Sequence, residues 1–437
     1  MSLTITQKIL ARACDRPRVD VGDIVFPTPD LVVIHDGYAC KLTEHLAELG
    51  ARDIVHPERV LVAVDHQIPA ATPQVAERLR LLRGHVERFG IGRFYDVGRG
   101  GNANVIPVEL GVARPGMLAM GYDIHVTNYG AVGCLAIPVG FDVTGVLAVG
   151  TTWIQVPATV AVELRGRLAP GVAVRDVAQR LLRTLDPAIA DYRVIEYRGS
   201  FLATLDIDGR MTLCNTPMEV GAKSVVFNPD DVIDAYLAAR GHAAADRAVA
   251  SDPDAGYERV IGVDVSDVAP QVAVPPRPDL VQDVGDVAGT RITRALVGSC
   301  AGGMLDDLRQ AASVLRGRRV SDGVAMMIVP ATQHVYGAAA REGLLQVFAD
   351  AGATVFPPGC GPCAGGVGGP LGSGDVCIAS ITRNDPGRMG AADASIYLAS
   401  AATVAASAVA GEITDPRAFT GAATNVSTTT TDSRRTR

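Results

Sequence analysis

The chain has few aromatic residues, few cysteines and no excess of basic charge. Aromatic side chains make up 5% of its 437 residues, and 40 basic residues stand against 47 acidic ones, for a net charge of −7. A molecule-wide basic surface for nucleic acid or anionic lipid is therefore not expected. Eight cysteines are too sparse for a disulfide scaffold. Residues 1–15 lack the apolar run of a secretory signal, which favours a cytoplasmic location.

Long uncharged stretches are also scarce, and the two that occur do not indicate a membrane protein. Between residues 114 and 163 the only charges are Asp123 and Asp142, but Pro138 and many glycines favour buried strand–turn–helix packing. Residues 395–411 are rich in alanine and serine, and this low hydrophobicity predicts a helix buried against other protein. No membrane insertion is expected.

What the chain does contain is a repeated alternation of apolar strand-like runs and amphipathic helical patterns. Residues 60–64 predict a buried strand that ends at Asp65-His66, and residues 117–120 predict one that leads to Asp123. Strand ends that carry His, Asp or Cys recur along the chain. The sequence therefore predicts an α/β fold with a site at the carboxyl ends of the strands.

Length and composition divide the chain into parts. A prior of roughly 150 residues per domain suggests about three domains. Residues 251–289 hold five prolines and eight acidic residues, which is typical of a linker. The predicted layout is a first domain over 1–155, a second over 156–250, the linker over 251–289, a third over 290–423 and a disordered Thr/Ser-rich tail over 424–437.

Three cysteines of the C-terminal third carry a chemical signal. Cys300 lies between a strand-like run and a helical pattern, where backbone N–H groups favour the thiolate. Cys360 and Cys363 form a Gly-rich Cys-x-x-Cys turn, which brings two sulfurs toward one metal or cluster. A zinc half-site, a redox pair or buried thiols remain alternatives at this point. Buried core thiols are the interpretation for the other cysteines: Cys14, Cys40, Cys134, Cys214 and Cys377.

Three thiolates, rather than four, would leave one iron of a cubane cluster open. An open iron can bind the hydroxyl and carboxylate of a hydroxy acid as a Lewis acid. Arg383 and Arg388 suit this chemistry, because an arginine fork binds carboxylates in a bidentate manner. Simple surface solvation is the alternative role for both arginines.

These motifs, in this order, resemble the aconitase superfamily, specifically the large subunits of 3-isopropylmalate dehydratase and homoaconitase. The resemblance spans nearly the whole chain. Its segments are the helix at 8–13, Asp65-His66, 121–125, 150–157, 214–222, 298–300, 359–363, 383–390 and 399–417.

The resemblance implies a three-domain aconitase-like core with a [4Fe–4S] cluster at the domain interface, and a hydro-lyase that dehydrates or isomerises a hydroxy di- or tricarboxylic acid. It also implies a small-subunit partner that supplies the catalytic serine, because no Gly-Ser-Ser-Arg motif occurs here. The implied cluster ligands are Cys300, Cys360 and Cys363. The implied catalytic residues are Asp65, His66, Asp123, His125 and Glu219, and the implied substrate-binding residues are His35, Asn104, Asn215, Arg383 and Arg388.

Several positions depart from the family pattern. Ile124 replaces the serine of Asp-Ser-His, Asn104 replaces a histidine, and Thr382 replaces the first asparagine of Asn-Arg-Asn. Ala301-Gly302-Gly303 follows Cys300 where Thr-Asn-Gly is usual. An altered, more apolar or smaller substrate is the interpretation of this pattern. The alternatives are a non-catalytic or regulatory cluster protein, which the acidic charge disfavours as an RNA binder, and a zinc site built from the three cysteines and a histidine.

Overall fold

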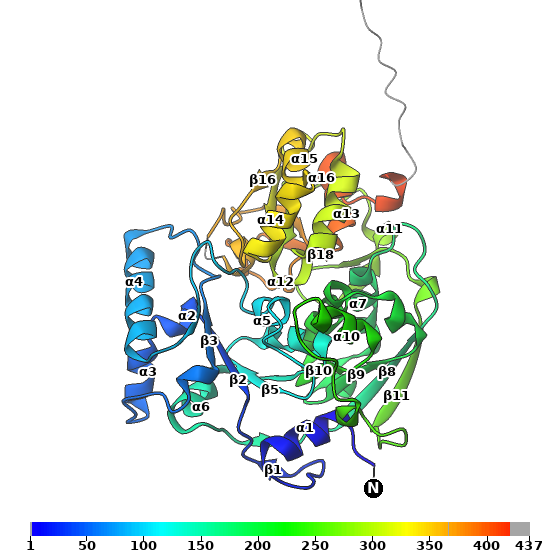
Figure 1. Cartoon of the computed structure of the whole chain (residues 1–437). Helices are drawn as coiled ribbons and strands as arrows, with labels where there is room; N and C mark the ends of the chain where they lie inside the picture. Colours follow the sequence, from blue (N-terminus) through cyan, green and yellow to red (C-terminus); the bar gives the residue numbers. More distant parts are fainter. Residues whose placement is uncertain (1, 366, 420–437) are drawn as a thin grey trace, which may run out of the picture.

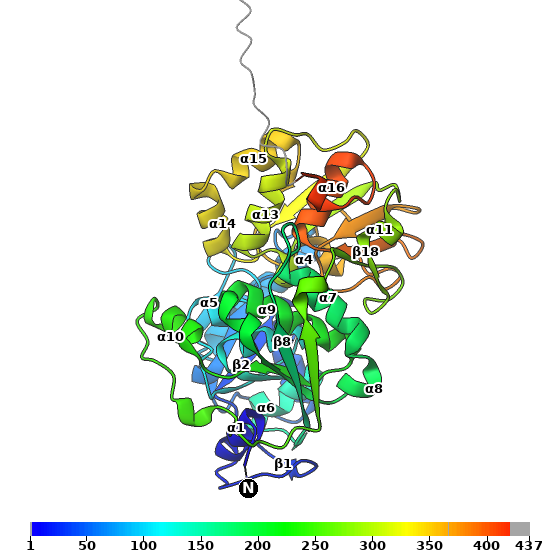
Figure 2. The same ribbon diagram turned by 90° about the vertical axis from the view of Figure 1, so that its right-hand side faces the viewer.

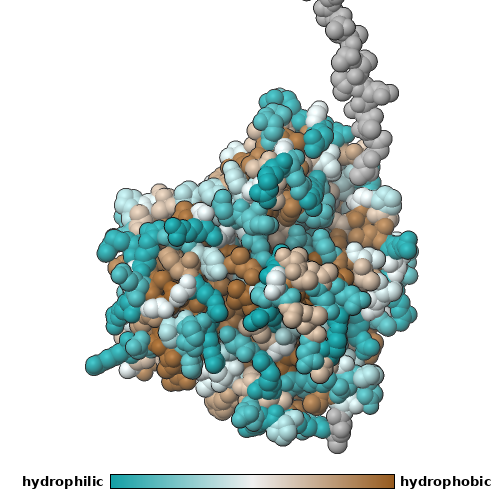
Figure 3. All heavy atoms as spheres, in the orientation of Figure 1, coloured by the Kyte–Doolittle hydropathy of each residue, from teal (hydrophilic) through white to brown (hydrophobic). Residues whose placement is uncertain are grey.

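Two bodies stacked on one another make up the molecule, as the computed structural model of the chain shows (Figures 1 and 2). The structure describes residues 2–365 and 367–419. The lower body contains a five-stranded and a four-stranded sheet, and the upper body contains a seven-stranded sheet. Figure 3 shows that hydrophilic residues cover most of one face, with hydrophobic residues gathered toward its middle. Among the described residues, no helix has the length and apolar character needed to cross a membrane.

The first sheet is parallel throughout and has the strand order β4-β3-β2-β5-β6. Its chain order reverses between β2 and β5, and in open α/β sheets such a reversal opens a crevice at the carboxyl ends of the strands. The strands are β2 (Leu31–His35), β3 (Val60–Ala63), β4 (Arg93–Tyr95), β5 (Leu118–Gly121) and β6 (Leu135–Pro138).

The second sheet is also parallel and has the order β10-β9-β8-β11. Three of its strands alternate with helices, and its core continues into that of the first sheet. Its strands are β8 (Thr159–Arg165), β9 (Val194–Arg198), β10 (Ser224–Phe227) and β11 (Arg259–Asp264).

The third sheet has the order β13-β12-β18-β17-β14-β15-β16, in which only β12 and β13 run antiparallel to their neighbours. It has a second reversal of chain order, between β14 and β17. The strands are β12 (Gln271–Ala273), β13 (Val281–Asp283), β14 (Arg294–Gly298), β15 (Ala325–Val329), β16 (Thr354–Val355), β17 (Val376–Ala379) and β18 (Ser395–Ala399). A separate ribbon pairs β1 (Ile24–Val25) with β7 (Ile154–Gln155).

Helices cover the faces of the sheets, and several of them begin at a side-chain cap. Thr72, Asp206 and Asp230 each accept a hydrogen bond from the first turn of the helix that follows them, which satisfies a backbone N–H without an intrahelical partner. The α-helices are α1 (Ile5–Ala13), α2 (Asp36–Ala39), α3 (Leu42–Glu48), α4 (Pro73–Arg88), α5 (Ile106–Glu109), α6 (Val143–Val149), α7 (Val174–Thr184), α8 (Pro187–Ala190), α9 (Ile207–Asn215), α10 (Asp231–Ala238), α11 (Val284–Val287), α12 (Ser299–Gly302), α13 (Leu305–Leu315), α14 (Gln333–Arg341), α15 (Leu344–Ala351) and α16 (Ala401–Ala410).

Two expectations about the chain's organisation change. The helix expected over 395–411 begins only at Ala401, because Ser395–Ala399 forms β18 in the middle of the third sheet, where Ile396 and Leu398 are buried. The segment 251–289 is packed rather than a bare linker, since β11 completes the second sheet while β12 and β13 extend the third. We propose a boundary near 155, after the first sheet, whereas the change from the second sheet to the third falls between β11 and β12, ahead of residue 290. The tail over 424–437 lies outside the described residues.

A buried carboxyl group at the start of α13 makes stability depend on pH. Asp307 accepts a hydrogen bond from the Met304 backbone N–H at 3.1 Å, and burial raises its pKa to about 8. An unfolded aspartate has a pKa near 3.9, so above this pH the native state holds a proton that the unfolded chain releases. The contribution of Asp307 to stability is therefore full below pH ~4 and is lost as the pH rises through about 8.

Asp307→Asn should raise the midpoint of thermal unfolding at pH 9 and leave it nearly unchanged or lower at pH 4.5. The asparagine keeps an acceptor for Met304 but never has to lose a proton. Each kcal/mol gained corresponds to roughly 2–4 °C for a domain of about 150–250 residues. Thermal melts of both proteins across this pH range measure the difference. If the two proteins differed in unfolding midpoint by the same amount at pH 4.5 and pH 9, the raised pKa assigned to Asp307 would be contradicted.

Candidate active site

One part of the site consists of side chains at the carboxyl edge of the first sheet. His35 ends β2, Asp65 and His66 follow β3, and Asp123 follows β5. Asp123 also caps the 3₁₀ helix η2 (Ile124–Val132), because its side chain accepts the backbone N–H of His125 at 2.7 Å. The structure places these candidate residues together at the carboxyl ends of the strands, where the chain order of the sheet reverses.

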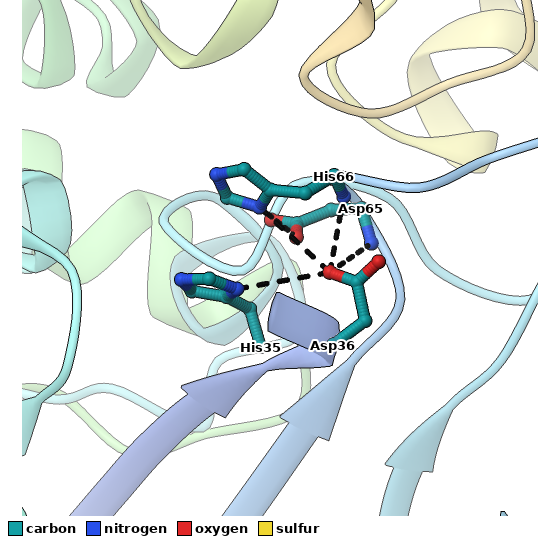
Figure 4. Close-up of side chains that lie close together, drawn as sticks. All are labelled: His35, Asp36, Asp65 and His66. Carbon is teal, nitrogen blue, oxygen red and sulfur yellow. Dashed lines mark hydrogen bonds and ion pairs between the residues drawn. The ribbon is translucent and has the colours of Figure 1, made fainter. Parts of the chain in front are cut away.

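Two histidines and two aspartates lie in contact with one another at this edge (Figure 4). The Nδ1 of His66 lies 2.6 Å from Oδ1 of Asp65, and the rings of His35 and His66 stack with centroids 4.1 Å apart. Asp36 lies between both histidines, with its Oδ1 3.7 Å from Nδ1 of His35 and 3.8 Å from Nδ1 of His66. The sequence predicted the other three residues for the site but not Asp36, although its place directly after a strand-end histidine was a signal.

Asp36 holds the turn that carries His66. Its carboxylate accepts the backbone N–H groups of His66 at 3.1 Å and Gln67 at 2.8 Å. Burial opposes ionisation of Asp36, but its hydrogen bond to His35 and the charge of His66 outweigh burial and lower its pKa. Asp36 is therefore a buried anion that fixes the backbone and ring of the neighbouring histidine.

The protonation of His66 follows from its neighbours. Burial alone lowers the pKa of His66, but the Cys360 sulfur and the Asp65 carboxylate outweigh it and hold the pKa well above its ordinary value. A histidine held by a carboxylate has a fixed tautomer and can carry a proton to a leaving group. The four residues of Figure 4 place ligand atoms within 4.8 Å of one another. Hydrogen bonds and ion pairs join these four residues to one another and to the backbone, and such a network can hold a proton.

A second acid–histidine group lies beside the first and joins all three sheets. His125 Nε2 lies 2.9 Å from Oε1 of Glu219, and its Nδ1 lies 3.2 Å from Oδ1 of Asp123. Burial works against the charge of His125, but Cys300, Asp123 and Glu219 raise its pKa well above the ordinary value. Glu219 belongs to the 3₁₀ helix η5 (Thr216–Val220), so the second part of the chain supplies it.

The three predicted cysteine ligands are buried and come from two loops of the third sheet. Cys300 lies in α12 directly after β14, and Ser299 before it has φ = 71°, a left-handed conformation that is uncommon outside glycine. Cys360 and Cys363 border and occupy the 3₁₀ helix η8 (Gly361–Ala364). The carbonyl of Asp65 accepts the Cys360 N–H at 2.9 Å, which ties this loop to the end of β3.

Each of the three sulfurs faces an N–H donor. The side-chain amide of Asn215 donates to Cys300 at 3.4 Å, and Arg388 donates to Cys363 at 3.7 Å. Asn102, which the sequence did not single out, donates to Cys360 at 2.9 Å. Such donors stabilise thiolate and cluster-ligand sulfur. The residues present therefore fit an iron–sulfur cluster.

The predicted substrate-binding residues surround this point. Arg383 lies 3.6 Å from Glu219 and 2.8 Å from Asp385, and Asn104 donates to Asp123 at 2.9 Å. Within the described ranges, several buried polar atoms nearby have no hydrogen-bond partner, which leaves them available to a ligand. These atoms are Oδ1 of Asn104, Oδ1 of Asn215, Oγ1 of Thr382 and Nε of Arg388.

The chain is similar to known proteins over nearly its whole length. The Aconitase family (aconitate hydratase) matches residues 7–411. The 3-isopropylmalate dehydratase large subunit 1 of Methanopyrus kandleri is 41% identical over 420 residues, which are 96% of this chain and 100% of the relative. The homoaconitase large subunit of Thermus thermophilus is 40% identical over 95% of this chain and 98% of its own length.

A solved structure, aconitase X of Thermococcus kodakaraensis in its holo form, aligns with 82% of this chain and 83% of its own at 12% identity and a TM-score of 0.46. The probable 3-isopropylmalate dehydratase large subunit of Methanothermobacter thermautotrophicus is 40% identical over 95% of this chain and 99% of its own length. The extent and identity of these sequence matches show that the chain belongs to the aconitase family.

Proposed function

We propose that the chain is the large subunit of an iron–sulfur hydro-lyase that dehydrates, and by rehydration isomerises, a hydroxy di- or tricarboxylic acid. The observation that carries this proposal is the set of three buried cysteines, each with an N–H donor, of which Cys360 lies 3.8 Å from Nδ1 of His66 in the Asp65–His66 pair. The names of the sequence relatives support the same reaction class.

A [4Fe–4S] cluster held by Cys300, Cys360 and Cys363 fits better than a single zinc ion. Ligands of one tetrahedral zinc lie about 3.8 Å apart when Zn–S bonds are 2.3 Å long. Within residues 2–365 and 367–419, the compact group of possible metal ligands is His35, Asp36, Asp65 and His66, and the three sulfurs do not form another. When bound, the cluster would supply a Lewis acid at its fourth iron.

The residues of this chain divide the remaining tasks. His66, oriented by Asp65, gives a proton to the departing hydroxyl. His125, held between Asp123 and Glu219, orients the bound acid and neutralises its charge on the side opposite to His66. Arg383 and Arg388 bind its carboxylates, and the unpartnered amide oxygens of Asn104 and Asn215 accept its hydroxyl groups.

A second chain completes the site in this proposal. The base that removes the carbon-bound proton is a serine of a small subunit, which also closes the cleft. The relatives named above are themselves called large subunits. A cytoplasmic location belongs to the same proposal, because three oxidisable thiolates need reducing surroundings.

Ile124 and Asn104 shape the substrate preference. Ile124 places a branched apolar side chain beside Asp123, and Asn104 places a neutral amide where the family pattern has a histidine. We propose that the substrate is smaller or more apolar than the acids of the family's usual members. No contact of these two side chains favours a non-catalytic or regulatory role.

The test is anaerobic purification together with the small subunit that this proposal requires, followed by iron and sulfide analysis, visible absorption and assays of a panel of hydroxy acids. We expect a brown protein and growth of the ultraviolet absorbance of a conjugated enoate. A colourless protein with one zinc per chain would favour the zinc alternative. A cluster-loaded protein inactive on every acid would favour the regulatory one.

A further inference from the structure

We propose that Asn102 is a positioning residue for the cluster, whose amide tunes the ligand sulfur of Cys360. This inference rests on the proposed function and adds a residue to which the family resemblance assigns no role. Asn102 belongs to the first part of the chain, in the loop between β4 and α5, yet its side chain reaches a cysteine of the third part.

The amide orientation of Asn102 is fixed by its surroundings. The side chain is fully buried, and its Oδ1 accepts the backbone N–H of Asn104 at 2.9 Å. Because Oδ1 has this donor, the Nδ2 must face the sulfur, 2.9 Å away. The Asn102 backbone N–H donates to the Ala331 carbonyl at 2.8 Å, which anchors the residue to the loop after β15.

The bond to Cys360 is the shortest nitrogen contact to a ligand sulfur, at 2.9 Å, against 3.4 Å for Asn215 and 3.7 Å for Arg388, while His66 Nδ1 lies 3.8 Å from the Cys360 sulfur. A donor to a ligand sulfur withdraws electron density from it, and this raises the reduction potential of an iron–sulfur cluster. Burial strengthens the effect because water does not compete for the sulfur. Asn102 should therefore make the cluster easier to reduce and harder to oxidise.

The same loop also contacts the proton-carrying residues. The backbone N–H of Ala103 donates to Oδ2 of Asp65 at 2.8 Å, and Asn104 donates to Asp123. Asn102 is thus the point where the loop that orients the two acids touches a cluster ligand. A purely structural role in this loop would not require the contact between the Asn102 amide and the Cys360 sulfur. The experiment therefore has to measure a property of the cluster.

Two variants separate the sulfur contact from the structural role. Asn102→Asp keeps the size and the acceptor for Asn104 but replaces the donor to Cys360 with a carboxylate oxygen. Asn102→Leu removes the donor without adding charge. Asn228→Leu is the matched control, since Asn228 donates to Glu196 at 2.7 Å and contacts no sulfur.

The cluster midpoint potential of each cluster-loaded complex is measured by titration monitored with EPR, and the rate of bleaching in air by visible absorption. Both Asn102 variants should shift the oxidised-to-reduced ratio at fixed potential about tenfold toward oxidised, equal to a one-electron midpoint about 59 mV lower. Both should also bleach several-fold faster. The control should match the wild-type protein in potential and bleaching.

An unchanged potential in Asn102→Asp and Asn102→Leu would overturn the inference and leave the proposed function standing. Wild-type protein without a cluster would overturn the proposed function and the inference with it. If Asn102→Leu takes up no cluster, Asn102→Ser is titrated in its place. Its shorter hydroxyl does not span the gap to Cys360, so the potential must fall in the same direction.

Discussion

Replacing Cys300, Cys360 or Cys363 with serine should reduce the bound iron to less than about a tenth of the wild-type content, because each is one of the three ligands that we propose for the cluster. A serine hydroxyl is a harder ligand and is not ionised at neutral pH. Iron and sulfide analysis of the anaerobically purified variants, together with their visible spectra, measures the loss.

Cys377→Ser is the matched control for these three variants. Cys377 is equally buried, in β17 beside β14, but its Sγ donates to the Ile378 carbonyl at 3.7 Å, whereas each proposed ligand sulfur accepts a side-chain N–H. This thiol should stay protonated and bind no iron, so the control should keep its colour. A bleached Cys377→Ser variant with a brown Cys300→Ser variant would show that the ligand assignment is wrong.

His66→Gln should lower kcat by about 10²- to 10⁴-fold, the usual contribution of a positioned proton donor, while the cluster is retained. Glutamine can still hydrogen-bond to Asp65 but cannot carry a proton to the leaving hydroxyl. The assay is steady-state dehydration by the complete complex, with iron content measured on the same sample. Retained iron with lost turnover separates a proton-transfer defect from cluster loss.

His85→Gln is the control for this variant. His85 is a half-buried histidine of α4 whose Nδ1 lies 2.9 Å from the Ala39 carbonyl. Its substitution should leave kcat within about threefold of wild type, as expected for a residue that touches no reacting group. If His66→Gln kept the wild-type kcat, another residue would have to provide the proton.

The sequence was most informative where a chemical group and a regular element coincide. The strands at 60–63 and 118–121 could be predicted because apolar runs end abruptly in Asp or His, and the strands of the first sheet expose these ends at one edge. The cysteine motifs were informative for a similar reason, because Cys300 comes directly after β14 and the turn with Cys360 and Cys363 comes after β16.

Contacts between ordinary residue types could not be predicted. Asn102 and Cys360 are 258 positions apart, and neither the Gly-Asn-Ala-Asn segment nor its loop has a pattern that points to a sulfur. The strand at 395–399 was missed because it runs directly into an alanine-rich helix. The packing of 251–289 was missed because its prolines lie between short strands rather than within them.

The seam between the Cys360 loop and the end of β3 restricts how the protein can open. A side chain at Gly359 would meet the Asp65 carbonyl at 2.6 Å, and the same carbonyl binds the Cys360 N–H. A rigid-body rotation that parted the upper and lower bodies at this seam would pull a metal ligand away from the acid beside it. An opening motion that keeps Cys360 beside Asp65 has to pivot elsewhere along the chain and leave this contact closed.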